Sequence, residues 1–228
     1  RLQLDEVWSF VGMNQKNVPP NRRGAFGKGD VYTWVAIDAE TKLVPSWLVG
    51  TRDAEYAKAF VSDLASRIAG RSQVTTDGHK AYLQAVEDAF GAEVDYAMLV
   101  KLYGNPEGNQ QERRYSAGKC CGTITGTVSG NPDPAHVSTS YVERQNLMMR
   151  MQMRRFTRLT NAFSKKIENH RHAISLHFMA YNFCRQHQTL RVSPAMAAGV
   201  SDHLWGVDEI IMMAETARKT KTVTKVVT

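Results

Sequence analysis

Residues 2–12 read LQLDEVWSFVG, and their side chains alternate with the two-residue period of a β-strand that has two different faces. One face would carry Leu2, Leu4, Glu6, Trp8 and Phe10. The other would carry Gln3, Asp5, Val7, Ser9 and Val11. Because aspartate has a low preference for strands, Asp5 stands out as a residue that structure alone explains poorly.

The first hundred residues continue this α/β pattern. Two further β-rich runs, VYTWVAI at 31–37 and KLVPSWLVG at 42–50, are joined by the turn DAET and predict a hairpin. Asp53 then begins a helix as its N-cap, SQVTTDG at 72–78 forms a short strand, and a helix and a strand lead to residue 100. Three strands in a meander, a crossover helix and a further strand predict a mixed sheet flanked by helices.

The remainder of the chain has a different character. Residues 100–138 are polar and rich in Gly, Pro and Asn, which predicts an irregular, mobile insertion loop. From about residue 139 the pattern is mostly helical, and it ends in a helix and a basic tail over 206–228. We therefore expect one main domain over residues 1–205. Because the chain opens at Arg1 inside a strand, we also expect that a preceding region is missing.

Charge is unevenly distributed along the chain. The net charge is +7, and residues 1–100 hold 11 Lys/Arg and 13 Asp/Glu, whereas residues 101–228 hold 18 and 9. An excess of positive charge in one part indicates a polyanionic partner, most simply nucleic acid. No apolar run approaches the roughly 18 residues of a membrane span, and no signal peptide is visible. We therefore expect a cytoplasmic protein without a membrane partner.

The three cysteines indicate reduced thiols in place of a disulfide framework. Cys120 and Cys121 are adjacent, and Cys184 is distant from both. A zinc site of Cys120, Cys121, His136 and His187 is disfavoured, because neighbouring cysteines are poorly placed to ligate one ion together.

Three acids at widely separated positions are candidates for a common site. Asp5 lies in the first strand, Asp77 ends the TTDG strand where its side chain would project from the sheet, and Glu143 lies near the start of a helix. Each has a structural alternative: edge protection for Asp5, a turn for Asp77, and a favourable helix dipole for Glu143. Brought together they would repel one another, so a hard divalent cation is their natural partner. Asp38 also ends a strand, but it begins the DAET turn and is assigned to structure.

The stretch STSYVERQNLMMRMQMRRFTRL at 138–159 contains one acid, Glu143, and five arginines. At about 100° per residue, Glu143, Asn146, Arg150 and Arg154 fall on one stripe of a helix, and apolar residues gather on the opposite side. We expect the apolar side to pack on the sheet and the stripe to face outward. In that arrangement Glu143 would bind metal, and the arginines would hold phosphates.

These segments together resemble a known family. LDEVWSFVG, VTTDG and YVERQNL, with an arginine seven residues after Glu143, are similar to the DDE transposases of bacterial insertion elements, specifically the insertion sequence 1 family. RRFTRLTNAFSKKIENH and YNFCRQHQTLRVSPAMAAG extend the resemblance nearly to Trp205. The resemblance implies a ribonuclease H-like fold with a DDE catalytic domain over residues 1–205. It also implies an N-terminal DNA-recognition region, which we expect to be the part missing ahead of Arg1.

The resemblance further implies roles for individual residues. Asp5, Asp77 and Glu143 would form the catalytic triad and hold two Mg²⁺ or Mn²⁺ ions about 4 Å apart. One ion would activate water and later the freed 3′-OH, and the other would stabilise the leaving 3′-oxygen, without a covalent protein–DNA intermediate. The residues expected to contact DNA are Arg144, Asn146, Arg150, Arg154, Arg155, Arg158, Lys165, Lys166 and His79.

The implied function is transposition of an insertion element. It comprises metal-dependent cleavage and strand transfer of double-stranded DNA at the element ends, by a homo-oligomer associated with the bacterial nucleoid. Two alternatives stay open: a ribonuclease H-like nuclease that only hydrolyses, and a domesticated relative that binds DNA without catalysis. The second alternative predicts that at least one triad acid is lost, and all three are present.

Overall fold

The computed structural model describes residues 1–104, 120–157 and 160–226, with side chains up to residue 216. The strands are β1 (Leu2–Val11), β2 (Gly29–Asp38), β3 (Ser46–Gly50), β4 (Ser72–Thr76), β5 (Val94–Tyr103) and β6 (Cys120–Ser129). The α-helices are α1 (Ala54–Ala65), α2 (Ala81–Phe90), α4 (Ser140–Gln152), α5 (Ile167–Met179), α6 (Pro194–Ala197) and α7 (Val207–Val226). Short 3₁₀ helices are η1 (Gln15–Asn17), η2 (Pro20–Arg22), η3 (Pro134–His136) and η4 (Arg154–Phe156), and η5 (Ala180–Cys184) is π-helical.

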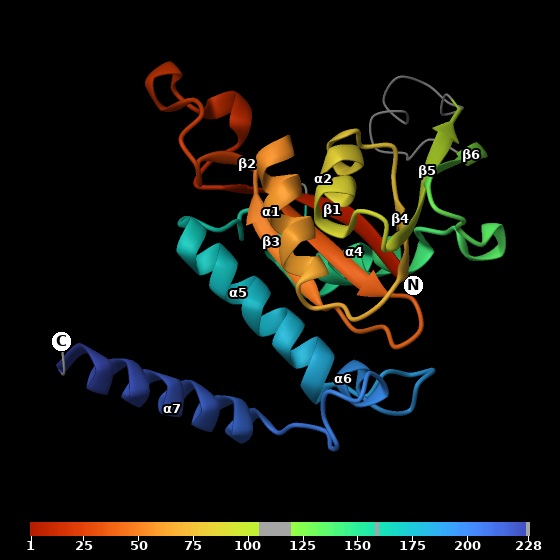
Figure 1. Cartoon of the computed structure of the whole chain (residues 1–228). Coiled ribbons are helices and arrows are strands. Elements are labelled where there is room, and N and C mark those ends of the chain that lie inside the picture. Colours follow the sequence, from red (N-terminus) through yellow and green to blue (C-terminus); the bar gives the residue numbers. More distant parts are fainter. Residues whose placement is uncertain (105–119, 158–159, 227–228) are drawn as a thin grey trace. The chain divides into compact units, whose positions relative to one another are not determined.

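The described strands form one six-stranded sheet in the order β3-β2-β1-β4-β5-β6 (Figure 1). β1, β2 and β3 form an antiparallel meander, and β4 and β5 add to it in parallel with β1. β6 returns antiparallel to β5 at the edge. A meander that continues into parallel strands, flanked by helices, is the arrangement of the ribonuclease H-like fold. The fold class expected from the sequence is therefore confirmed.

Helices cover both faces of the central strands (Figure 1). α1 and α2 pack on one face, where Leu4, Trp34, Phe60 and Tyr82 belong to a fully buried core. α4 packs against β1 on the other face. The alternation of side chains along β1 thus sends Leu2 and Leu4 toward α1 and α2, and it sends the intervening residues toward α4.

One difference from the expected elements lies in residues 100–138. The expectation of an irregular loop is wrong for residues 101–103, which continue β5, and for β6, which pairs with them. β6 is exposed along almost its whole length, and glycines at 122 and 126 interrupt the β-branched Thr, Ile and Val residues that favour a strand. Pairing of its backbone with β5 holds it in place. Residues 105–119 of the expected loop lie outside the described residues.

A second difference is the end of α4. The helical pattern was expected to continue to Arg154 and beyond, but α4 ends at Gln152, and Met153 has extended backbone angles. The chain turns here because Phe156 enters the core, where it is 1% exposed and its ring lies 5.2 Å from that of His170. Tertiary packing overrides local helix preference at this point. Arg154 therefore does not continue the stripe of Glu143 and Arg150.

The chain divides into two compact units. The first comprises residues 1–40 and 44–171, and the second comprises residues 41–43 and 172–228. The division falls inside α5, earlier than the boundary near residue 205 that the sequence suggested. The complete sheet and the acids of interest belong to the first unit. Among the described residues, no helix combines the length and the apolarity that crossing a membrane requires.

Candidate active site

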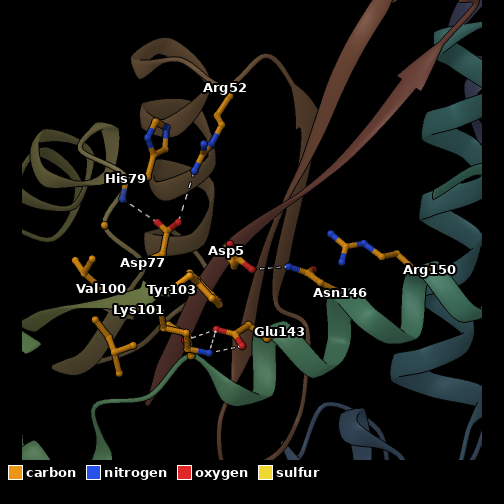
Figure 2. Close-up of a pocket in the computed structure, with 13 residues that line it drawn as sticks. Asp5, Arg52, Asp77, His79, Val100, Lys101, Tyr103, Glu143, Asn146 and Arg150 are labelled. Atoms are coloured by element: carbon orange, nitrogen blue, oxygen red, sulfur yellow. Dashed lines mark hydrogen bonds and ion pairs between the residues drawn. The ribbon is translucent and has the colours of Figure 1, made fainter. Parts of the chain in front are cut away.

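Asp5 and Glu6 are neighbours in β1 and therefore point to opposite faces of the sheet. Asp5 faces α4, where the side-chain amide of Asn146 donates a hydrogen bond of 2.8 Å to its Oδ2 (Figure 2). Glu6 faces the α1 and α2 side, and its side chain is 1% exposed. Its nearest cation is Arg52, whose Nη2 lies 3.4 Å from Glu6 Oε2. The two carboxylates start from opposite sides of the sheet, but β4 ends at Thr76 beside Leu4, and beyond that point oxygens of Asp5 and Glu6 come within 4.8 Å of each other.

Asp77 follows directly after β4, which pairs in parallel with β1 up to Leu4 and Thr76. Its position just beyond that pair brings its carboxylate beside Asp5. The backbone N–H of His79 donates to Asp77 Oδ1 at 2.9 Å, which fixes the side chain in a turn. Arg52 Nη2 lies 3.6 Å from Asp77 Oδ2, so Asp77 and Glu6 share the single positive charge of this guanidinium.

Glu143 is placed by the first turn of α4. Thr139, at the N-cap, gives no side-chain cap to the backbone. Instead, Gln3 Oε1 of β1 accepts the backbone N–H groups of Tyr141 and Val142 at 2.8 and 3.2 Å. The first N–H groups of a helix have no hydrogen-bond acceptor within the helix. Here two of them donate to a buried side chain of β1, so these hydrogen bonds hold the start of α4 against β1. That attachment holds Glu143 near Asp5.

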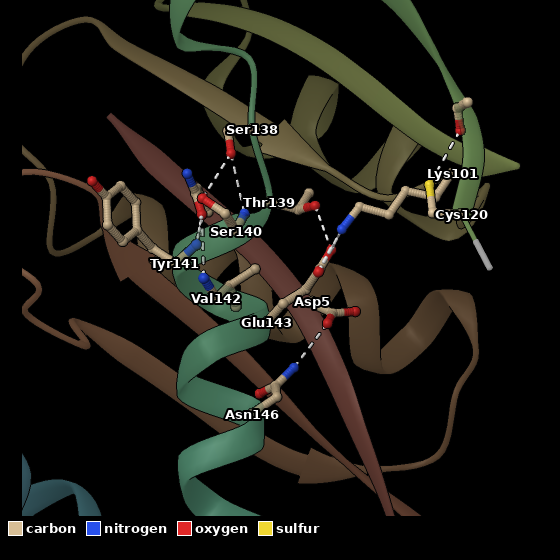
Figure 3. Close-up of polar contacts among 12 residues, drawn as sticks. Asp5, Lys101, Cys120, Ser138, Thr139, Ser140, Tyr141, Val142, Glu143 and Asn146 are labelled. Atoms are coloured by element: carbon tan, nitrogen blue, oxygen red, sulfur yellow. Dashed lines mark hydrogen bonds and ion pairs between the residues drawn. The ribbon is translucent and has the colours of Figure 1, made fainter. Parts of the chain in front are cut away.

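Glu143 has two partners of its own (Figure 3). Lys101 of β5 places its Nζ 2.5 Å from each carboxylate oxygen. The hydroxyl of Thr139 donates to Oε1 at 2.6 Å. Although partial burial opposes it, the hydrogen bond and the charge of Glu143 raise the pKa of the Lys101 ammonium. Glu143 is therefore paired with a cation from the neighbouring strand.

Except for Gln3 and Glu6, these side chains line one cleft of about 630 Å³. Acids, amides and cations from β1, β4, β5 and α4 converge in it (Figure 2). Its lining residues are Asp5, Arg52, Asp77, Gly78, His79, Leu99, Val100, Lys101, Tyr103, Thr139, Glu143, Asn146 and Arg150. The three acids expected from the sequence thus share one cleft, although 72 and 66 positions separate them along the chain.

The electrostatics of the cleft favour a cation. Burial raises the pKa of Asp5 to about 6, and the negative charge of Asp77 adds to this shift. Burial also raises the pKa of Glu6 to about 8, again with a contribution from Asp77, while Arg52 opposes it. Burial lowers the pKa of His79. For Asp5 and Glu6, burial and the neighbouring carboxylates disfavour the ionised form, and a cation bound beside them would offset that cost.

The residues fit a divalent metal ion. Carboxylate oxygens of Asp5, Glu6 and Asp77 lie within 4.8 Å of one another, and no other such group of His, Cys, Asp or Glu occurs among the described residues. Glu6 Oε1 is buried and accepts no hydrogen bond. Hard oxygen ligands with unmet charge are what Mg²⁺ and Mn²⁺ bind. Glu143 lines the same cleft but is not in this close group, because Lys101 holds it.

The residues expected to contact DNA occupy several different positions. His79, Asn146 and Arg150 line the cleft. Asn146 was expected on an outward stripe, but it is 4% exposed and serves to orient Asp5. Four of the residues expected to contact DNA are exposed but do not line the cleft: Arg144, Arg154, Lys165 and Lys166.

Arg155 and Arg158 complete that set. Arg155 Nη1 donates to Ser164 Oγ at 2.9 Å and to the carbonyl oxygen of Asn169 at 3.2 Å. Its side chain therefore links η4 to residues 164–169 within the protein. Arg158 lies outside the described residues. Arg155 therefore differs from its exposed neighbour Arg154, although both were expected to grip DNA.

Several residues of the site were not expected from the sequence, among them Glu6, Arg52, Lys101 and Tyr103. Glu6 carried a usable signal, since it is an acid in the otherwise apolar row of β1 that includes Leu4 and Trp8. Lys101 and Tyr103 lay in a stretch taken as a loop, and Arg52 lay between a strand and a helix. Only the fold brings them to the acids. Asp38, by contrast, accepts the backbone N–H of Glu40 at 3.3 Å, which confirms its role in the turn.

Comparison with known proteins supports one class. Residues 26–120 match a family model described as a DDE domain, that of the IS240 transposases. This match supports a DDE transposase. The matched range includes Asp77 but neither Asp5 nor Glu143. IS240 is a different family from insertion sequence 1, so the finer assignment made from the sequence is not confirmed.

One solved structure with similarity is the cryo-EM structure of the piggyBac transposase synaptic complex with hairpin DNA. The similarity covers 78% of this chain and 44% of that chain, with 13% sequence identity and a TM-score of 0.34. The chain thus spans less than half the length of that transposase. No curated protein matches the chain at a significant level.

Proposed function

We propose that this chain is the catalytic part of a transposase that cuts DNA at the ends of an insertion element and joins the freed ends to a target. The observation that carries the proposal is the meeting of Asp5, Asp77 and Glu143 in one cleft beside Arg150. Three acids from a central strand, a strand end and a helix have no structural reason to share a cleft in which Asp5 has no cation within ion-pair distance among the described residues. The match of residues 26–120 to a DDE domain supports the same class.

The proposed reaction has two chemically similar steps. Water adds to a phosphodiester phosphorus while the bond from phosphorus to the 3′-oxygen breaks, which leaves a 3′-OH and a 5′-phosphate. The 3′-OH then attacks a phosphodiester of the target, and a second 3′-oxygen departs with a proton. Neither step needs a protein nucleophile. The protein has to hold the phosphate in line for attack and neutralise the charge that develops on it.

A divalent ion in this cleft would supply activation of the attacking hydroxyl and neutralisation of the leaving oxygen. Asp5 and Asp77 would hold it, with Glu143 as the third acid and Mg²⁺ or Mn²⁺, in two sites, as the ions. Asn146 orients Asp5, and the His79 backbone N–H orients Asp77. Arg150, on the same wall of the cleft as Glu143, would bind the scissile phosphate.

The partners follow from the charge and from the reaction. Double-stranded DNA would lie along the exposed basic residues, among them Arg144 and Arg154, which add non-specific affinity. Joining two element ends calls for at least two copies of the chain, so we propose a homo-oligomer on DNA. We also retain the insertion sequence 1 family as a proposal, because the motifs around Asp5, Asp77 and Glu143 extend beyond the matched range of residues 26–120.

The test is cleavage and joining with defined DNA. Wild type and the variants Asp5→Asn, Asp77→Asn and Glu143→Gln are incubated with supercoiled plasmid and Mg²⁺, and with a labelled duplex that carries a pre-cut 3′-OH end. We expect each variant to lose at least about a hundredfold in cleavage rate while retaining DNA binding. Glu87→Gln removes an exposed carboxylate of α2 outside the cleft lining and is the matched control. Equal rates in Glu143→Gln and wild type would contradict the proposal.

The pre-cut duplex separates the two enzymatic alternatives. A transposase joins the 3′-OH end to the plasmid, whereas a ribonuclease H-like nuclease cuts the plasmid and joins nothing. A domesticated DNA-binding protein binds the duplex and does neither. The presence of all three acids in one cleft favours the first two over the third.

A further inference from the structure

The contact between Lys101 and Glu143 is the closest ion pair of the cleft. Lys101 Nζ lies 2.5 Å from both carboxylate oxygens, whereas Arg52 approaches Asp77 only to 3.6 Å. Asp5 has an amide partner, Asn146, and no cation within ion-pair distance among the described residues. Of the three proposed catalytic acids, Glu143 is thus the one whose charge is fully matched from within the chain.

This contact conflicts with the proposed role of Glu143. Both oxygens of its carboxylate bind the ammonium group, and the Thr139 hydroxyl adds a hydrogen bond to Oε1 (Figure 3). A divalent ion that shared this carboxylate would meet a positive charge at hydrogen-bond distance from the same oxygens, and the two cations would repel each other. Glu143 can therefore join Asp5 and Asp77 around a metal ion only after Lys101 has moved.

Lys101 is suited to such a move. A lysine is a compact charge on a flexible stem of four carbons, so its ammonium can change partners without a change of backbone. The backbone of Lys101 is fixed in β5, where it pairs with Thr123 of β6. Its side chain is 27% exposed, which leaves the ammonium open to the cleft that Arg150 and His79 also line. A phosphate in that cleft would be the strongest competing partner for the ammonium group.

We propose that Lys101 is an exchangeable counter-ion of Glu143, which it holds in the metal-free chain and leaves for a phosphate of bound DNA when Glu143 turns to the metal. The proposal rests on the proposed function, because it takes DNA and a divalent ion as the ligands of this cleft. It assigns Lys101 to DNA binding, and it makes DNA and metal binding mutually favourable. Such coupling is reciprocal by thermodynamic necessity.

The first test measures Mn²⁺ binding without DNA, by isothermal titration calorimetry on the full chain. We expect Lys101→Met to bind Mn²⁺ about tenfold more tightly than wild type, because the competitor of the metal ion for the Glu143 carboxylate is removed. Lys101→Arg keeps the charge and should stay within about twofold of wild type. Lys80→Met is the matched control, since it removes an exposed lysine next to His79 that does not line the cleft.

A double-variant cycle separates direct competition from general electrostatics. In the Glu143→Gln background, Lys101 has no carboxylate to hold, so adding Lys101→Met should change Mn²⁺ affinity by less than about twofold. If the tightening persists in that background, or if Lys101→Met binds Mn²⁺ no more tightly than wild type and Lys80→Met, Lys101 is not the counter-ion proposed here.

The second test adds DNA. A saturating 30-base-pair duplex should raise the Mn²⁺ affinity of wild type by a larger factor than that of Lys101→Met, in which nothing is left to displace from Glu143. Equal factors for the two proteins would overturn the exchange. Strand cleavage is measured on separate samples. Absence of cleavage by wild type would count against the proposed function alone, because the Mn²⁺ comparison does not depend on turnover.

Discussion

His170 illustrates how single polar contacts hold the first unit together outside the cleft. It is fully buried, with Nε2 3.1 Å from Ser9 Oγ and Nδ1 2.8 Å from Ser164 Oγ. Arg155 donates to Ser164 Oγ, and Ser9 donates to the carbonyl oxygen of Val31 at 3.3 Å. A neutral ring that donates from Nε2 and accepts at Nδ1 satisfies every member of this chain of hydrogen bonds. Protonation of the ring would break that pattern.

The pH dependence of stability should report this histidine. Burial, and then the charge of Arg155, lower the pKa of His170 to about 4 from 6.5. In the unfolded chain His170 is protonated below about pH 6.5, whereas in the folded chain it is protonated only below about pH 4. Wild type should lose stability relative to His170→Gln as the pH falls through this window, by on the order of 3 kcal/mol in total. Asp5 and Glu6 bind protons more tightly when folded and act in the opposite sense, but they are common to both proteins and cancel.

The measurement is urea unfolding of both proteins at half-unit pH steps from 7.5 to 4. A constant difference in unfolding free energy between wild type and His170→Gln over that range would show that His170 is not held neutral by the fold.

Arg154 and Arg155 are adjacent but should respond differently to the same substitution. Arg155→Gln removes the donor to Ser164 and Asn169, so we expect the free energy of unfolding to fall by about 1–3 kcal/mol. Arg154 is exposed and holds no described partner, so Arg154→Gln should change it by less than about 0.5 kcal/mol. Thermal melts of the two variants side by side give the answer. Equal melting temperatures would contradict the structural role of Arg155.

At the scale of elements, α4 matters most because it carries Glu143, Asn146 and Arg150 into the cleft. Its start depends on Gln3, which is 2% exposed and accepts two backbone N–H groups of the helix. Packing of Val142 and Met149, both fully buried, holds the rest of the helix on the sheet. The orientation of the proposed catalytic glutamate is thus decided by a glutamine in another element.

Gln3→Ala should therefore impair catalysis through α4. It leaves the Tyr141 and Val142 N–H groups unpaired, and we expect a loss of about 1–3 kcal/mol of stability. Cleavage at a temperature where the variant is fully folded should fall at least about tenfold, because Glu143 is no longer held in register. Gln73→Ala, which also loses side-chain hydrogen bonds to backbone but at the exposed Asp133 loop, is the control. Full activity in Gln3→Ala would show that α4 is positioned by its apolar contacts alone.

The elements also show what could be predicted from the sequence. β1, β2 and β4, and the N-cap at Asp53, were predictable because alternation and capping are local signals. β6 was not predicted, because its Thr, Ile and Val residues are interrupted by glycines within a Gly-, Pro- and Asn-rich stretch. The end of α4 was not, because the burial of Phe156 decides it. The three acids were predictable because each occupies a position that secondary structure alone explains poorly. Lys101 was not, because its partner Glu143 is 42 residues away and the end of β5 has the composition of a loop.

At the scale of the whole molecule, negative and positive charge are concentrated in different parts of the sequence. The acids that would hold metal lie mostly in the first hundred residues, which are net negative, and the excess of Lys/Arg lies after them. In the cleft itself the three acids are balanced by Arg52, Lys101 and Arg150, so the cleft alone offers DNA little net attraction. Basic residues outside the cleft are therefore needed to bring the phosphate backbone close, and their contribution is screened by salt.

DNA binding should accordingly weaken steeply with ionic strength. We expect the logarithm of the association constant for a 30-base-pair duplex to fall linearly with the logarithm of salt concentration, and Arg144→Gln to reduce the slope by about one. Fluorescence anisotropy between 50 and 300 mM KCl measures both slopes, with Glu87→Gln as the control that leaves the slope unchanged. An identical slope in Arg144→Gln and wild type would remove Arg144 from the DNA-binding surface.

The register of β1 carries a consequence for mutation by insertion or deletion. Asp5 is opposite Val35, and the parallel pairing with β4 ends one residue earlier, at Leu4 and Thr76. Suppose that one residue ahead of Asp5 were deleted and β1 kept its hydrogen bonds to β2 and β4. Asp5 and Glu6 would then exchange faces of the sheet, and the apolar side chains beside them would leave the face on which they are now buried. Length variation at this end of the chain should therefore be tolerated only outside the strand, since within it the spacing between neighbouring codons determines which carboxyl group meets α4.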